Sequence, residues 1–122
     1  MDADYIRDLF AELGTVHVRR MIGGAGIYAG DVMFGLVSDG LIYLKADTDT
    51  APTFEREKCA PFEYATKTGK RAVMSYWRLP ERLYDDPAEL AQWARQAIAV
   101  ARQSAVKKPA AKARTKRKKT KR

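Results

Sequence analysis

Two turn dipeptides divide the first half of the chain into short apolar runs and thereby limit what it can fold into. Gly30-Asp31 separates GIYA from VMFGLVS, and Asp39-Gly40 separates VMFGLVS from LIYLK. Turn residues of this kind between apolar runs are a strong hairpin signal, because they tolerate the positive φ that a tight turn requires. These residues predict three consecutive antiparallel strands.

Two other parts of the chain have the alternation of a strand. In residues 16–21, Val16, Val18 and Arg20 alternate with His17, Arg19 and Met21, which suggests a strand with one wet face. Later, residues 62–67 and 72–78 predict a second hairpin across Thr68-Gly69, with Pro80 closing its second strand.

Three segments have the periodicity and the caps of helices. The first opens at Asp2 or Asp4 and stops at Gly14, and the second is expected between a cap at Asp49 or Thr50 and Pro61. The apolar residues of the first are Ile6, Leu9, Phe10 and Leu13.

The last helix has the clearest start. Asp86 is its expected cap, Pro87 takes the first helical position, and Glu89 stands where the acid of a capping box stands. One continuous apolar stripe follows at helical spacing: Leu90, Trp93, Ala94, Ala97, Ile98 and Ala101.

The order of these elements predicts an α+β class and a two-layer domain over residues 1–105, with a mainly antiparallel five-stranded sheet packed by helices. Three strands are counted before the second helix and two after it. A single cysteine, Cys59, allows no internal disulfide, and no run of about 18 apolar residues predicts a membrane span. With an acidic, amphipathic N-terminal segment, these features favour a cytoplasmic protein without a membrane partner.

Residues 106–122, which we call the basic tail, have a different composition from the body. The last sixteen residues contain ten Lys or Arg and no acid, whereas residues 1–106 contain 13 basic and 15 acidic residues. The net charge of +8 therefore belongs to the tail and not to the body. Such a segment is predicted to be disordered when free, because it cannot bury a core and its charges repel one another.

Lysine and arginine at this density associate with a polyanion by releasing counterions, without reading a sequence. The tail therefore predicts binding to DNA or RNA, and with it a possible nucleoid association; the alternative is a solvating extension. The predicted nucleic-acid-binding residues are Lys107, Lys108, Lys112, Arg114, Lys116, Arg117, Lys118, Lys119, Lys121 and Arg122.

Other candidate site residues give weaker signals. The glycines Gly23, Gly24 and Gly26 are compatible with an anion-binding loop, but they fit a bulge or a close strand crossing better. The single histidine and the single cysteine have no plausible metal-binding spacing, and the aspartate pairs 47/49 and 85/86 read as loop and cap residues. No catalytic residues, cofactor or metal are predicted, so the chain is not expected to be an enzyme.

Aromatic residues in the predicted strands offer a second route to nucleic acid, since flat rings on a sheet can stack with unpaired bases. The alternative is that they are ordinary core residues. Arg19 and Arg20, being neighbours on one strand, are expected to point to opposite faces. The candidate stacking residues are Tyr28, Tyr43, Tyr64, Tyr76 and Trp77.

The run RRMIGGAGIYAGDVMFGLVSDGLIYLKAD, residues 19–47, resembles the N-terminal domain family of TfoX/Sxy, regulators of competence for DNA uptake in bacteria. Ile22 stands where that family usually has an aromatic residue. Further similarities follow in the same order along roughly residues 5–101: Pro61-Phe62-x-Tyr64, Met74-Ser75-Tyr76, Asp86-Pro87-x-Glu89-Leu90, and Trp93-Ala94.

The resemblance implies a small α+β domain without established catalytic residues. Together with the tail, it leads to the expectation of a non-enzymatic regulatory protein held non-specifically on DNA or RNA. In that picture the body binds a protein partner or forms a homodimer. The alternatives are a protein-interaction module, or a small anion-binding domain, that acts without nucleic acid.

Overall fold

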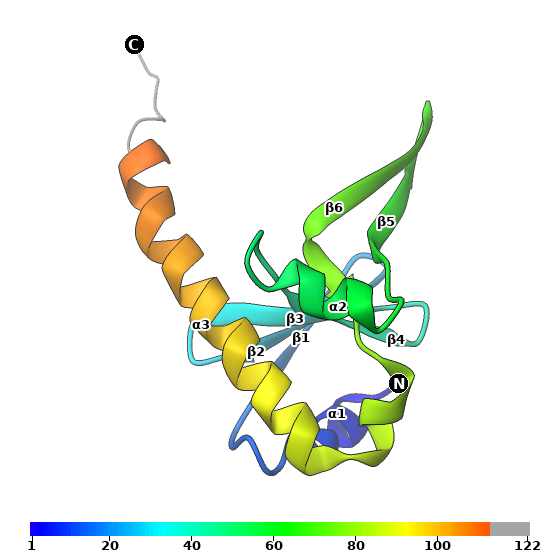
Figure 1. Cartoon of the computed structure of the whole chain (residues 1–122), viewed down its shortest axis with the longest axis vertical. Coiled ribbons are helices and arrows are strands. Elements are labelled where there is room, and N and C mark those ends of the chain that lie inside the picture. Colours follow the sequence, from blue (N-terminus) through cyan, green and yellow to red (C-terminus); the bar gives the residue numbers. More distant parts are fainter. Residues whose placement is uncertain (113–122) are drawn as a thin grey trace.

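The computed structural model describes the backbone of residues 1–112 and the side chains of residues 1–105. Three α-helices, one 3-10 helix and six strands follow one another along this part of the chain (Figure 1). Their bounds are α1 Ala3–Leu9, β1 His17–Met21, β2 Gly24–Ala29, β3 Val32–Ser38, β4 Leu41–Lys45, α2 Ala51–Arg56, β5 Pro61–Thr66, β6 Gly69–Arg78, η1 Glu81–Asp85 and α3 Pro87–Lys112.

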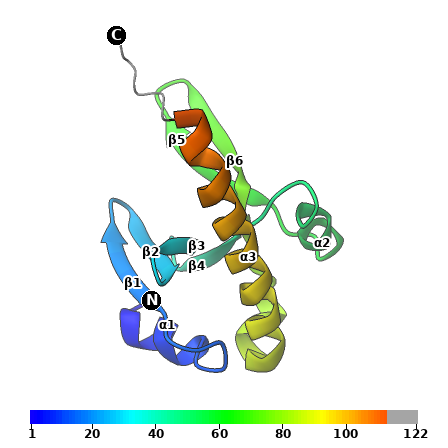
Figure 2. The same ribbon diagram turned by 90° about the vertical axis from the view of Figure 1, so that its left-hand side faces the viewer.

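The strands form one antiparallel sheet in the order β1-β2-β3-β4-β6-β5. The predicted α+β class is confirmed, but the sheet has six strands and not five. The alternating segment after Val16 is a strand of its own, because it turns back at Ile22-Gly23 and pairs with β2. The β5–β6 hairpin projects away from the other strands in both views (Figures 1 and 2).

The predicted hairpin turns are present. Asp39 and Gly40 have φ angles of 52° and 74°, and Gly30 has a φ of 62°. At Asp39-Gly40, positive φ at both central residues gives the twist that joins two antiparallel strands through a two-residue loop, whereas at Gly30-Asp31 only the glycine has positive φ. The turn chemistry in the sequence therefore sets the pairing of β2, β3 and β4.

Two of the predicted helix caps are confirmed. The Asp2 carboxylate accepts a hydrogen bond from the Tyr5 amide (2.8 Å), and that of Asp86 accepts one from the Glu89 amide (3.2 Å). The capping-box role of Glu89 is wrong, since its carboxylate bonds to Arg82 instead.

The second helix starts and ends differently from the expectation. Thr50 is the N-cap, but its side chain caps nothing, and the Asp47 carboxylate accepts from the Asp49 and Thr50 amides instead. The helix ends at Arg56, and Lys58 takes a φ of 62°, so the chain has already turned before Pro61.

Helix α3 continues to Lys112, beyond the predicted start of the basic tail at residue 106. Alanine, lysine and glutamine are strong helix formers, and the residues just after 101 are rich in them. The predicted boundary between body and tail thus falls inside α3. The disorder predicted for the rest of the tail concerns residues 113–122, which lie outside the described residues.

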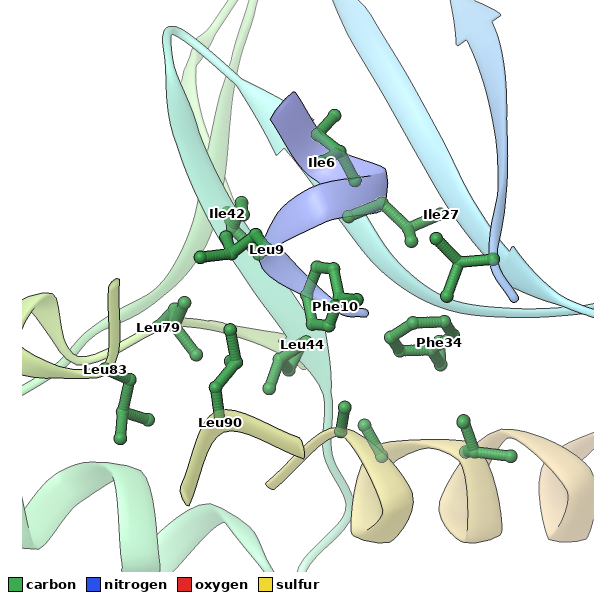
Figure 3. Close-up of a cluster of buried hydrophobic side chains, with 14 of the residues drawn as sticks. Ile6, Leu9, Phe10, Ile27, Phe34, Ile42, Leu44, Leu79, Leu83 and Leu90 are labelled. Atoms are coloured by element: carbon green, nitrogen blue, oxygen red, sulfur yellow. The ribbon is translucent and has the colours of Figure 1, made fainter. Parts of the chain in front are cut away.

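A single apolar core lies between the helices and one face of the sheet (Figure 3). Phe34 is fully buried, and its ring meets that of Phe10 edge to face at 5.6 Å. Among the described side chains, the core cluster begins at Ile6 and ends at Ala101. Its largest fully buried members include Ile6, Phe10, Ile27, Phe34, Ile42, Leu44, Leu79, Leu83 and Leu90.

Phe34 enters this core through an irregularity in the sheet. Ile27 of β2 lies opposite Gly35, whereas the next residue, Tyr28, lies opposite Met33. Phe34 is therefore the extra residue of a β-bulge, which changes the alternation of the strand around it.

Within residues 1–112, no helix is both long and apolar enough to cross a lipid bilayer.

An ion-pair cluster ties η1 to two other helical segments. Arg82 donates to the Glu57 carboxylate, just after α2, at 2.8 Å, and to that of Glu89 in α3 at 2.9 Å. The Trp93 indole N–H also donates to Glu89, at 3.2 Å. The hydrogen bonds with Arg82 lower the pKa of both carboxyls.

We expect Arg82→Gln to lower the melting temperature at pH 7 and to have a smaller effect at pH 3. Because the folded-state pKa values of the two glutamates lie below their ordinary value of 4.5, the stability they contribute is present above that pH. It is lost as the pH falls through the lowered values. Thermal unfolding followed by circular dichroism from pH 7 to pH 3 measures the difference. Arg102→Gln, on the exposed side of α3, is the control, and a gap between Arg82→Gln and the parent chain that stays constant across this range contradicts the prediction.

Candidate functional site

The structure does not describe how the predicted nucleic-acid-binding side chains of the tail lie relative to one another. Lys107, Lys108 and Lys112 lie on the last turns of α3, but their side chains lie outside the described part. The other seven predicted residues, Arg114, Lys116, Arg117, Lys118, Lys119, Lys121 and Arg122, lie outside the described residues altogether. Binding by the tail thus stays a prediction.

The glycines proposed for anion binding lie in and beside β2. Gly24 and Gly26 belong to that strand, which pairs with β1 on one side and β3 on the other. A Cβ on Gly24 would lie 1.8 Å from the backbone oxygen of Val37. The geometry favours the close strand crossing over the anion loop, and the weak anion-binding assignment stays untested.

The sheet has two chemically different faces. The strand residues of the apolar core, such as Ile27, Ile42, Leu44 and Trp77, point to the face that the described helices cover. We call the other side the open face. The register places the following residues on it: Arg19, Gly26, Tyr28, Met33, Leu36, Tyr43, Lys45, Tyr76 and Arg78.

The β5–β6 hairpin adds two aromatic rings to the open face. The Phe62 ring meets the Tyr43 ring at 5.0 Å, and the Tyr64 ring stacks on Phe62 at 6.4 Å. Arg71 lies directly opposite Tyr64 in the hairpin, so it shares their side. The result is a row of three rings that runs from the middle of the sheet to its β5 edge, where Tyr64 is 46% exposed.

Two cations of the open face lie over aromatic rings. The Arg19 guanidinium lies 5.0 Å from the centre of the Tyr28 ring, and the Lys45 ammonium lies 4.9 Å from that of Tyr76. Burial raises the pKa of Tyr76 to about 12, and its hydroxyl donates to the backbone oxygen of Met33 at 3.4 Å. Tyr76 is therefore neutral at physiological pH and adds no negative charge to this face.

A hollow of about 260 Å³ opens beside the rings of Phe62 and Tyr64, which line it from β5. Met21, at the end of β1, and Ile22, in the β1–β2 turn, line it from the other side. Because β1 and β5 are the two edges of the sheet, their residues can share one hollow only if the sheet is strongly bent. Ile22 is fully exposed at its rim.

Four of the five aromatic residues that the sequence proposed for stacking lie on the open face. Trp77 does not, because it follows Tyr76 directly in β6 and so points into the core, where it is 3% exposed. Phe62 was missed, although it lies two residues before Tyr64 and the alternation of β5 could have indicated it. The opposite orientation of Arg19 and Arg20 is confirmed by the register of β1.

The remaining candidates lie apart from the open face or show no reactive setting. His17 is exposed at the start of β1. Cys59 is half-buried, and burial raises the pKa of its thiol. In residues 1–105, no group of three or more His, Cys, Asp or Glu side chains is arranged to hold a metal ion.

Comparison with known proteins adds the family context. Residues 8–101 match the family model described as the TfoX N-terminal domain. The chain is 32% identical over 87 residues to the DNA transformation protein TfoX1 of Aliivibrio fischeri, which covers 71% of this chain and 41% of that protein. It is 26% identical over 92 residues to Protein Sxy of Escherichia coli, covering 75% of this chain and 44% of that protein. The chain thus spans less than half the length of either relative.

Proposed function

Because this chain belongs to the TfoX N-terminal domain family, we propose that it is a non-enzymatic regulatory protein that acts in the cytoplasm while held on nucleic acid by its basic tail. The name of the Aliivibrio fischeri relative connects that protein with DNA transformation. We extend this role to the chain described above as part of the proposal. The body, on this view, supplies the specific contact, and the tail supplies non-specific affinity.

One observation carries the proposal: the charge is divided between body and tail. Residues 1–106 have a net charge of about −2, with 13 basic and 15 acidic residues, whereas the last sixteen residues have ten positive charges. Because the net charge of the body is slightly negative, we expect non-specific affinity for duplex nucleic acid to come from the tail. The proposal includes no catalytic role for Asp47 or Asp86. The carboxylates of both residues accept hydrogen bonds from neighbouring backbone amides, as expected of turn and cap residues.

We expect the full chain to bind a labelled 20-base-pair duplex with a steep salt dependence that residues 1–106 lack. If all ten tail cations contact phosphates, the slope of log K against log salt reaches about −9. Fluorescence anisotropy between 50 and 200 mM salt measures both chains. The truncated chain keeps the complete core, which ends at Ala101.

A full-length variant with glutamine at all ten cationic positions of residues 107–122 is the matched control for chain length. It should bind duplex as weakly as residues 1–106. Equal affinity of the full and truncated chains at low salt contradicts the tethering proposal and favours a module that acts through protein contacts alone.

A further inference from the structure

The strands of the body differ in charge from its helices and loops. Within the six strands that the structure describes there are six Lys or Arg and one carboxylate, whereas the rest of residues 1–106 contain seven Lys or Arg and fourteen carboxylates. The one strand carboxylate, Glu63, lies opposite Ala72 and so points away from the side of Phe62 and Tyr64. The open face therefore has no strand carboxylate, and four of the six strand cations share it: Arg19, Lys45, Arg71 and Arg78.

The aromatic rings of the open face lie among these cations. Tyr64 is the most exposed ring and stacks on Phe62, and Arg71 lies across from it in the hairpin. The guanidinium of Arg19 covers Tyr28 near the opposite edge of the sheet. An arrangement of flat rings alternating with cations offers stacking partners for bases and charge partners for the phosphates between them.

We propose that the open face of the sheet binds single-stranded nucleic acid, with bases stacking on Tyr64 and on the Arg19–Tyr28 pair and with Arg71 and Lys45 beside the phosphates. A duplex keeps its bases stacked on one another and out of reach of these rings, so the rings select unpaired bases. The hollow of about 260 Å³ beside Tyr64 is smaller than the sites that enclose drug-sized ligands, and it suits one flat ring system.

A second copy of the chain is a poorer occupant of the open face. In a two-fold symmetric dimer, each surface patch meets itself. The cations Arg19 and Arg71 of one copy would then face the same cationic patch on the other copy. Like charges brought together in an interface are costly, whereas a phosphate backbone neutralises them.

This site is separate from the tail and goes beyond the tethering described above. The tail binds any phosphate polymer through charge alone, while the open face needs unpaired bases. Binding by the tail and binding by the open face can therefore be lost independently of each other. Removing residues 107–122 tests the tail, and changing exposed residues of the sheet in the full chain tests the open face.

The decisive experiment compares matched pairs of variants in binding to a fluorescein-labelled 15-mer of thymidine. Tyr64→Ala should weaken binding of the full chain by about 5- to 100-fold, the range for loss of one stacking ring, and Tyr64→Phe should restore it. Arg71→Glu should weaken binding, whereas Lys70→Glu, the same charge change on the neighbouring residue that faces the other way, should have a much smaller effect. The measurement is repeated with residues 1–106 at 100 mM salt, where the tail cannot mask the site.

Three results would overturn the proposal. One is equal loss in Arg71→Glu and Lys70→Glu, which would mean that only net charge matters. Another is binding of an abasic 15-mer as tight as that of the thymidine 15-mer, because stacking would then play no part. The third is unchanged affinity in Tyr64→Ala while its melting temperature stays at the parent value. Crosslinking of a 5-iodouracil oligonucleotide to peptides of β1 and β5 would support the site independently of any variant.

Discussion

Replacing Phe34 by alanine should lower the free energy of unfolding by about 3–5 kcal/mol, a large part of the 5–15 kcal/mol that keeps a domain of this size folded. The side chain is fully buried, packs edge to face against Phe10, and lies between the sheet and the helices (Figure 3). Because the residues on either side of it, Met33 and Gly35, are both paired with β2, the backbone at Phe34 cannot simply shift inward to fill the space. Urea denaturation followed by tryptophan fluorescence measures the loss.

Tyr64→Ala is the matched control for Phe34→Ala, since it removes an aromatic ring from an exposed strand position. It should change the free energy of unfolding by well under 1 kcal/mol. Phe34→Leu keeps most of the volume and should cost less than about 1.5 kcal/mol. Equal destabilisation by Phe34→Ala and Tyr64→Ala would mean that the core is not where the structure places it.

Gly24→Ala should be the most damaging of the glycine substitutions in β2. The added Cβ would lie 1.8 Å from the backbone oxygen of Val37 in β3, and no flexible side chain can move to make room. The two strands must separate, which we expect to cost about 3 kcal/mol or more, at the upper end of what overpacking usually costs. The same urea titration measures it.

Gly26→Ala is the control within the same strand. Its Cβ would meet the sulfur atoms of Met33 and Met21 at 2.7 and 3.0 Å. These lie at the ends of flexible side chains that can turn aside, so the cost should be clearly smaller than for Gly24→Ala. A larger effect at Gly26 than at Gly24 would be inconsistent with the strand crossing described above, and would reopen the question of what the glycine run is for.

Local signals in the sequence predicted most of the fold. The Asp39-Gly40 turn and the Asp2 and Asp86 caps could be read directly, because each depends on residues a few positions apart. The first strand was not counted in the predicted sheet, since the glycines after it hid a two-residue turn at Ile22-Gly23. The hydrogen-bond partner of the Glu89 carboxylate could not be predicted from the sequence. Its partner, Arg82, belongs to the preceding 3-10 helix η1 and not to α3.

The open face was predictable only in part. Alternation along a strand places Arg19 and Arg20 on opposite sides, and the same rule separates Tyr76 from Trp77. The alternation rule fails between β5 and β6, where Pro61 lies opposite Trp77 but Phe62 lies opposite Val73. Residues 74–76 are left over at that point, and Met74 accepts a hydrogen bond from the Trp77 indole through its backbone oxygen. Such an irregularity depends on tertiary packing, so the row from Tyr43 to Tyr64 could be found only in three dimensions.

Four of the six strand cations share the open face and no strand carboxylate does, so the strand residues of this face are net positive although the body as a whole is slightly acidic. An uneven charge distribution of this kind steers a protein toward a highly charged polymer before contact is made. We therefore expect the body to meet a polyanion with the open face leading, so that fewer encounters occur in an unproductive orientation. Salt should slow this capture more than it speeds release, because screening acts on the approach at long range.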